Sequence, residues 1–305
     1  NNSTVYKDMN PECPRCRANG NEVARHGTFY RRCDARAIDR FRCKACRSTF
    51  SRATNTPAFR QKKRRINRQL MALLSACVSM RRAALLLNVS RSTVSRRLEF
   101  LGEQAREQEE RQLDREAPVR QVQLDDLITL EHTKCKPLSV CVVVDSQQRL
   151  IQGFGVARIP ASGNLAAISR KKYGKRPDES RKMRDELFAE LQHRIDPEAC
   201  FCTDGHDQYA TLIRRYFPEA SHAVHKGKPA CVTGQGELKK AGFDPLFSVN
   251  HTLAMLRANI NRLVRRTWCT TKKPEALQHH LWIYLSAHNG MIRKKMATAD
   301  ASAST

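Results

Sequence analysis

Hydrophobic and polar positions follow two different periods along the chain. Between residues 66 and 101, apolar side chains recur at helical spacing. After residue 118, short runs rich in β-branched residues predict strands, and helical patterns follow them. The predicted strands are 119–124, 138–144, 150–159, 199–203 and 221–225, and the predicted helices are 178–195, 206–217 and 250–268. Three adjacent strands followed by alternating helices and strands predict a mixed α/β sheet domain.

Within the first helical region, the segment Arg81–Leu98 predicts two helices joined by a tight turn at Asn88, with Ser90 as the N-cap of the second. This pattern is typical of a helix-turn-helix, and an ordinary bundle with a solvated basic face is the alternative. The second helix presents polar groups that could reach phosphates and base edges in a major groove. They are Arg91, Ser92, Thr93, Ser95, Arg96 and Arg97. A preceding basic run, either solvated or an arm on the DNA backbone, comprises Lys62, Lys63, Arg64 and Arg65.

These patterns divide the chain into several predicted parts, which make it a multidomain protein. We expect a first domain at 1–56, a helix-turn-helix domain at 57–102, a solvated connector helix at 103–117, an α/β domain with a mixed sheet at 118–296, and a disordered tail at 297–305. Pro118 ends the connector, because a proline disfavours helical conformation in the residue before it. The tail is small and polar, and such segments bury too little apolar surface to fold.

Charge narrows the class of partner. The chain has 305 residues, with 55 Lys and Arg against 30 Asp and Glu, which gives a formal net charge of +25. Self-repulsion of this size is tolerated mainly where a polyanion neutralises it, so an ordinary small-molecule enzyme is disfavoured. Nucleic acid is favoured over a membrane surface, because no segment approaches the roughly 20 apolar residues that span a bilayer. The first ten residues lack the features of a signal peptide, so we expect a cytoplasmic protein.

The cysteines predict a metal site near the start of the chain. Twelve cysteines in a reducing compartment favour metal ligands or buried thiols over disulfides. Two CxxC pairs, Cys13 with Cys16 and Cys43 with Cys46, match a structural tetrahedral Zn²⁺ site. Hairpin-like strands between the pairs make a zinc ribbon the natural frame. An iron-sulfur cluster and chance pairing are the alternatives.

Carboxylates follow two of the predicted strands. Asp125 and Asp126 come after the first, and Asp204 with Gly205 comes after the fourth. In a ribonuclease H-like sheet, carboxylates at these two strand ends face one another and can hold a pair of Mg²⁺ ions. Asp-Gly is also a common turn. A third element is the helix that Asn250 begins, whose inner face would carry Ala254, Arg257 and Asn261.

The order of these elements resembles the bacterial transposases of insertion sequence one and its close relatives, in which Asp, Asp and Glu residues are catalytic. The likeness covers nearly the whole chain and is carried by Leu124-Asp125-Asp126, by Cys202-Thr203-Asp204-Gly205, and by the helix from Val249 through Arg257. It implies that Asp125 and Asp204 are the first two catalytic residues and that Arg257 is the family's helical arginine. The Glu position is Asn250 here, and some relatives are described as having Asp, Asp and Asn.

An asparagine at this position has a physical consequence. It offers a carbonyl oxygen but no charge, so the cluster would hold a second metal more weakly. DNA phosphates could complete the coordination. Glu237 and Asp244 are alternative third ligands, ranked lower because neither lies at a helix start seven residues before an arginine.

The resemblance implies a DNA transposase with structural Zn²⁺ and two catalytic Mg²⁺ ions. It would bind the terminal inverted repeats of a mobile element in the bacterial nucleoid, cut them, and join them to target DNA as a dimer or higher oligomer. A catalytically silent DNA-binding relative is one alternative. A ribonuclease H-like nuclease acting on branched or hybrid substrates is another.

Overall fold

The structure is a computed structural model that describes residues 23–32, 35–54, 56–225, 244–264 and 267–303. It divides into two compact units, Asn1–Gln69 and Leu70–Thr305, and each is described by itself. Within the first unit, an antiparallel sheet is formed by β1 (Val23–Arg31), β2 (Arg36–Cys43) and β3 (Thr49–Phe50). A small core around Phe41, Cys43 and Phe50 holds it together. The predicted hairpin is confirmed, with strands longer than expected.

Three helices follow, α2 (Ile66–Leu74), α3 (Met80–Leu86) and α4 (Arg91–Leu113). The predicted turn and cap between the last two are confirmed. Asn88 has a positive φ of 48°, and the Ser90 side chain accepts a hydrogen bond from the backbone N–H of Thr93 at 3.2 Å. Small polar side chains at such a cap satisfy N–H groups that have no partner within the helix, so Ser90 fixes where α4 begins.

The expectation of a separate, solvated connector was wrong. Helix α4 continues without a break from the predicted second helix into the predicted connector, and it ends at Leu113. Its second half is buried at Leu101, Ala105 and Leu113, against the long helix α9 (Pro274–Ala303). The approach is close at Gly102, where a Cβ would lie 2.5 Å from the Cβ of His279. The helices α4 and α9 therefore join the helical bundle to the sheet domain through a shared core.

Helix α9 itself is the largest departure from expectation, since no helix was predicted there. Most of the segment expected to be a disordered tail belongs to it, because the helix continues through Ala303. Alanine has the highest helix propensity, and three alanines after residue 298 favour continuing the helix over ending it. The expectation of disorder was therefore wrong for residues 297–303.

The second unit contains a five-stranded mixed sheet in the order β6-β5-β4-β7-β8. Its strands are β4 (Val119–Leu130), β5 (Pro137–Asp145), β6 (Ile151–Arg158), β7 (Ile195–Thr203) and β8 (Ser221–Val224). The first three form an antiparallel meander, whereas β7 pairs in parallel with β4, and β8 in parallel with β7. This confirms the predicted mixed α/β sheet domain.

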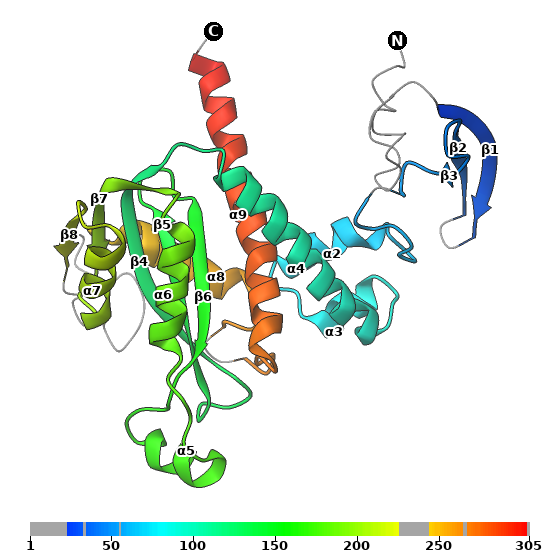
Figure 1. The fold of residues 1–305 in the computed structure, drawn as a ribbon. Coiled ribbons are helices and arrows are strands. Elements are labelled where there is room, and N and C mark those ends of the chain that lie inside the picture. Colours follow the sequence, from blue (N-terminus) through cyan, green and yellow to red (C-terminus); the bar gives the residue numbers. More distant parts are fainter. Residues whose placement is uncertain (1–22, 33–34, 55, 226–243, 265–266, 304–305) are drawn as a thin grey trace. The chain divides into compact units, whose positions relative to one another are not determined.

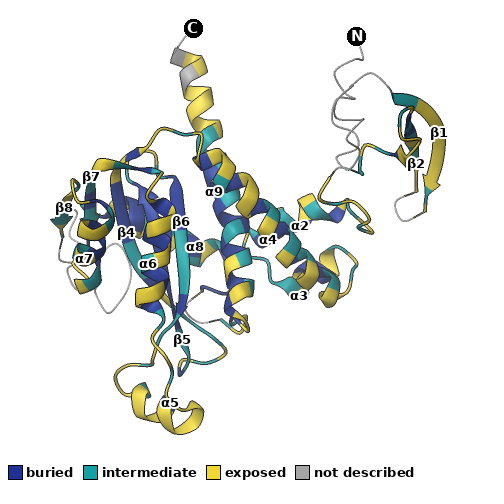
Figure 2. Cartoon of the chain, viewed as in Figure 1, coloured by how far each residue is buried: buried dark blue, intermediate teal, exposed yellow. Residues whose placement is uncertain are grey.

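Helices cover both faces of the sheet, and Figure 2 shows the central strands buried between them. On one face lie α6 (Ser180–Leu191) and α7 (Asp207–Tyr216), packed over a core that includes Leu124 and Phe201. The other face carries α8 (Phe247–Asn259) and α9, packed over a second core that includes Leu127. Because side chains alternate along a strand, neighbouring residues of β4 face different helices.

Two further segments differ from expectation. The segment 162–177, which the sequence predicts to be a basic loop, contains a helix, α5 (Leu165–Tyr173), between β6 and α6. The helix predicted for 250–268 begins earlier, at Phe247, and ends at Asn259. No described helix combines the length and apolar character that crossing a membrane requires.

Candidate active site

Two aspartates lie at the same level of two adjacent parallel strands, one inside β4 and one just after β7. The ladder between β4 and β7 pairs Gln123 with Cys202, and Asp125 and Asp204 each lie two residues beyond that pair. Asp125 was expected after its strand, but β4 continues past it to Leu130 by pairing with β5. Asp204 directly follows the last residue of β7. The parallel register therefore places the two aspartates on neighbouring strands, close enough for the Asp204 carboxylate to raise the pKa of Asp125; their role as metal ligands stays a prediction.

A glycine turn fixes the backbone at Asp204. Gly205 has a φ of +89°, and a Cβ there would lie 2.7 Å from the Val224 side chain on β8. Any other residue would be strained by both the φ and the contact. The Asp204 Oδ1 then accepts a hydrogen bond from the backbone N–H of His206 at 3.1 Å. The turn thus directs the chain from β7 into α7 while leaving the Asp204 side chain exposed.

A buried glutamine fastens α8 to the strand that carries Asp125. The Gln123 Nε2 donates to the backbone carbonyl of Pro245 at 2.8 Å, and its Oε1 accepts from the Val249 N–H at 3.1 Å. These bonds satisfy backbone groups at the start of α8, which helix geometry leaves without partners. Asn250 follows Val249 in this first turn of α8. The clamp therefore holds the first turn of α8 against β4, two residues before Asp125.

The Asp125 carboxyl is electrostatically strained. Burial raises its pKa to about 6, and the Asp204 and Asp126 carboxylates add to the rise. A hydrogen bond from the Asp126 N–H at 2.7 Å and the Arg257 guanidinium act in the opposite direction. Arg257, on α8, is therefore close enough to interact with Asp125. Two carboxylates facing one another with incomplete compensation are a suitable environment for a divalent cation.

Asp126 has a different role, because it points to the other face of the sheet. Its carboxylate forms an ion pair with Arg184 on α6, whose side chain is 3% exposed. The Arg184 Nη1 also donates to the Gln208 Oε1 on α7 at 2.6 Å, and its guanidinium lies 5.7 Å from the centre of the Tyr209 ring. Asp126 therefore links β4 to α6 and, through Arg184, to α7.

The third predicted ligand, Asn250, is exposed in the first turn of α8. Its Nδ2 donates a hydrogen bond to the Asp244 Oδ2 at 3.0 Å. The amide oxygen, Oδ1, is the atom that could coordinate a metal ion. Among the described residues, His, Cys, Asp and Glu side chains do not form a group of three that could hold a metal ion. Among the described residues, the Asn250 amide therefore stays the candidate for a third ligand beside Asp125 and Asp204. Glu237, an alternative considered from the sequence, lies outside the described residues.

The predicted inner face of α8 was only partly right. Arg257 is half-buried and interacts with Asp125, but Ala254 is exposed and Asn261 lies beyond the end of the helix. The buried face is formed instead by Ser248, Val249, Thr252, Leu253 and Leu256.

Only half of the predicted zinc site lies within the described residues. Cys43 ends β2, and the Cys46 N–H donates to its Sγ at 3.4 Å. Arg47 has a φ of 60°, the left-handed conformation for which glycine is preferred. An N–H bond to sulfur in a turn of this kind suits a thiolate ligand. Cys13 and Cys16 lie outside the described residues, so the four-cysteine site stays a prediction.

The predicted DNA-contacting residues of α4 fall into two groups. Arg91, Ser92, Ser95 and Arg96 are exposed, whereas Thr93 and Arg97 are half-buried. The hydroxyls of Ser92 and Thr93 both lie 2.9 Å from that of Ser90, so they belong to the helix cap. The basic run before α2 is exposed at Lys62, Lys63 and Arg65, and half-buried at Arg64.

Sequence reasoning missed the residues that hold the aspartates in place, above all Gln123 and Arg184. Gln123 gives no clear signal, because Arg120 and Gln121 precede it in the same strand and its partners come from the distant helix α8. Arg184 gives none either, since it occurs in a helix rich in charged residues. A comparison with known families found no matching family model, and a comparison with curated proteins found no match.

Proposed function

We propose that this protein is a metal-dependent DNA transposase with a ribonuclease H-like catalytic domain. The observation that carries the proposal is the proximity of Asp125, on β4, and Asp204, just after β7, on adjacent parallel strands of a sheet of order β6-β5-β4-β7-β8. An antiparallel meander followed by two parallel strands is the topology that this fold requires. The proposal also covers binding of an element's terminal repeats, strand cleavage and strand transfer.

The donor set suits two Mg²⁺ ions held by Asp125, Asp204 and the Asn250 amide. All three donors are oxygens, the ligands that Mg²⁺ prefers. The raised pKa of Asp125 reflects negative charge that a divalent cation would compensate. Bound metal would supply activation of a water nucleophile and stabilisation of the leaving oxygen. In this arrangement Arg257 would offset excess negative charge beside Asp125, and Gln123 would hold the first turn of α8 in position.

DNA recognition would use the basic face of α4 and a zinc ribbon in the first unit. Exposed Arg91 and Arg96 lie on a helix whose start is fixed by the Ser90 cap, which favours a rigid reading element. Because two element ends have to be joined, we expect at least a dimer in the active complex.

The test uses full-length protein with duplex DNA taken from the regions that flank its coding sequence. We expect nicking at the junctions and joining of ends in Mg²⁺ or Mn²⁺, and inhibition by chelator. Asp125→Asn and Asp204→Asn should each reduce cleavage by about 10³-fold or more, since each replaces a charged metal ligand by a neutral amide. Asp185→Asn is the matched control, because its carboxylate pairs with Arg215 on the surface of the protein.

A silent DNA-binding protein is the second candidate, and the bond from Asn250 to Asp244 is the observation that favours it. An amide group whose orientation is set by a hydrogen bond to Asp244 is not positioned by metal binding alone. If the wild-type protein binds these DNA ends without any metal-dependent cleavage, and Asn250→Glu introduces cleavage, the protein is a catalytically silent DNA-binding protein. Cleavage by the wild type that the aspartate variants lose excludes it.

A further inference from the structure

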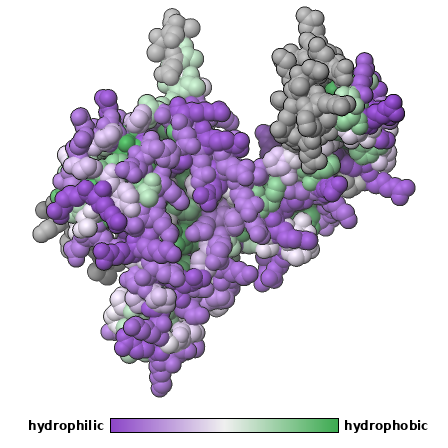
Figure 3. Space-filling view, viewed as in Figure 1, coloured by the Kyte–Doolittle hydropathy of each residue, from purple (hydrophilic) through white to green (hydrophobic). Residues whose placement is uncertain are grey.

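A basic segment projects from the sheet domain on the loop between β6 and α6. This segment, residues 160–177, is called the arm; it contains α5 and forms the projection at the bottom of Figure 1. It carries five basic residues and no acidic residue. The exposed ones are Arg170, Lys171, Lys172 and Lys175. Figure 3 shows its surface as mostly hydrophilic.

The arm has almost no core of its own. Ser169 is the only buried residue of α5, and its hydroxyl donates to the backbone carbonyl of Cys135 at 2.7 Å. The Lys136 Nζ lies 4.5 Å from the centre of the Tyr173 ring, so α5 rests on the turn between β4 and β5. That turn adds the exposed Lys134 to the basic surface.

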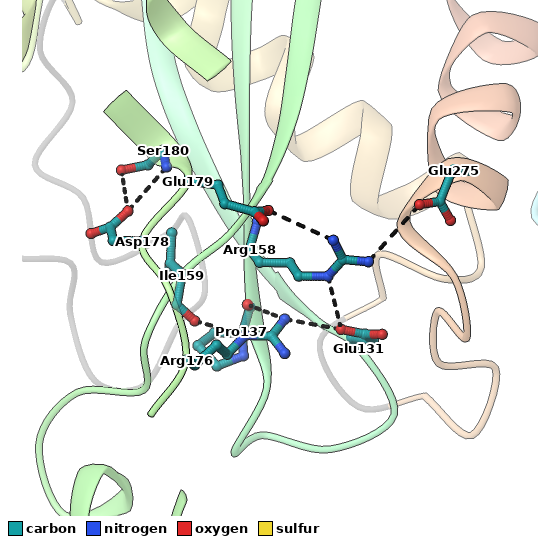
Figure 4. A network of polar contacts seen from close by, with 9 residues as sticks. All are labelled: Glu131, Pro137, Arg158, Ile159, Arg176, Asp178, Glu179, Ser180 and Glu275. Carbon is teal, nitrogen blue, oxygen red and sulfur yellow. Dashed lines mark hydrogen bonds and ion pairs between the residues drawn. The ribbon is translucent and has the colours of Figure 1, made fainter. Parts of the chain in front are cut away.

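Ionic contacts fasten the base of the arm to the sheet, as Figure 4 shows. The Arg176 Nη2 donates to the Glu131 Oε2 at 2.9 Å, and its Nε donates to the backbone carbonyl of Ile159. Arg158 lies within 3.9 Å of three carboxylates, those of Glu131, Glu179 and Glu275. The Glu131, Glu179 and Glu275 carboxylates near the base are therefore paired with the two arginines, whereas Asp178 accepts hydrogen bonds from Ser180.

The outer cations of the arm lack such partners. Within the part of the chain that the structure describes, no ion pair involves the side chains of Arg170, Lys171, Lys172 or Lys175. A rigidly mounted group of positive charges, with its neighbouring acids neutralised, favours a polyanionic partner.

The base of the arm lies near the end of β4, the strand that carries Asp125. Glu131, at its base, directly follows β4, and Asp125 lies six residues earlier on the same strand. At about 3.3 Å per residue, the base of the arm lies roughly 20 Å from Asp125 along the strand. That length corresponds to about six base pairs of duplex at 3.4 Å each.

We propose that the arm binds the phosphate backbone of target DNA, the duplex into which the cut ends are joined. Its exposed cations are lysines and one arginine, which contact phosphates without requiring a sequence, and a target has to be held without sequence preference. The arm is attached to the sheet that carries Asp125, whereas the proposed reading helix α4 begins in the core of the helical bundle. This inference rests on the proposed function.

The test compares two triple variants of the full chain. The arm variant carries Arg170→Gln, Lys171→Gln and Lys172→Gln, and the control removes three equally exposed charges elsewhere through Arg115→Gln, Lys294→Gln and Lys295→Gln. The probe is a 30-base-pair duplex of arbitrary sequence, titrated at several salt concentrations. We expect the arm variant alone to bind about tenfold or more weakly, with a salt slope smaller by about 2 to 3.

A second measurement distinguishes target DNA from end DNA as the duplex that the arm binds. Joining of pre-cut ends into a target duplex should fall in the arm variant, while binding and cleavage of the end DNA stay within about twofold of the wild type. Equal binding by arm and control variants overturns the proposal, and so does an equal loss of end cleavage and joining in the arm variant. If the wild type cleaves nothing, the proposed function fails, but the duplex titration still tests whether the arm binds DNA.

Discussion

Asp125 and Asp126 are neighbours in β4, yet the sheet places them in opposite electrostatic environments. Asp126 faces α6 and is neutralised by Arg184, so it acts as a structural link. Asp125 faces the α8 side and lies near a second carboxylate, Asp204, and the cation that lowers its pKa is Arg257. The difference follows from the alternation of side chains along a strand. One carboxylate is used for stability, and the other is kept at an energetic cost that a bound cation would relieve.

Breaking the ion pair on the α6 face should have the largest effect on stability. We expect Arg184→Met to lower the free energy of unfolding by about 3 to 5 kcal/mol, because it leaves the Asp126 carboxylate without its partner. The double variant Asp126→Asn with Arg184→Met should recover more than half of the loss. Urea unfolding followed by circular dichroism measures both. Equal losses in the single and double variants would show that packing of the arginine, and not its charge, is what matters.

Removing the charge on the α8 face should have the opposite sign. The folded-state pKa of Asp125 is about 6, above its ordinary value of 3.8. The folded protein therefore binds this proton more tightly, and the stability that this site contributes falls as pH rises from about 4 to 6. Asp125→Asn should then raise the free energy of unfolding by about 1 to 3 kcal/mol at pH 7.5, and by nothing at pH 3.

That prediction has to be measured as a difference between variants. Burial lowers the pKa of His280 to about 4, so stability at that site rises with pH over nearly the same interval. The two trends oppose one another in the wild type, and subtraction of the Asp125→Asn profile isolates the carboxylate. Asp185→Asn serves as the surface control. A destabilised Asp125→Asn protein at pH 7.5 would mean that Arg257 already compensates the charge.

The smallest expected effect is stabilisation by a divalent cation, which should depend on the Asp125 carboxylate. Mg²⁺ at a few times its dissociation constant should stabilise the wild type by about 1 kcal/mol. The variant Asp125→Asn should show a much smaller shift, whereas Asp185→Asn should match the wild type. Thermal unfolding with and without 10-fold excess chelator gives the measurement. An equal Mg²⁺ shift in all three proteins would place the cation elsewhere.

The amino-acid sequence by itself determined the local elements and the residue types of the candidate site. Strand and helix periods identified every strand of the sheet, and the Ser90 cap located the start of α4, because these features depend on neighbouring residues. The same local signals placed Asp204 after the fourth strand, whereas Asp125 and Asp126, expected after the first strand, lie within it. They also marked the basic loop, though not the helix α5 within it.

Only the tertiary structure decided which residues share an environment. That Asp125 meets Asp204 while Asp126 meets Arg184 depends on the parallel register of β4 with β7 and on which helices cover each face. Helix α9 completes both the bundle and the sheet core, and its burial against α4 turned an expected solvated connector into core. Such contacts join residues far apart in the chain, and their free energy comes from burial, which no local pattern specifies.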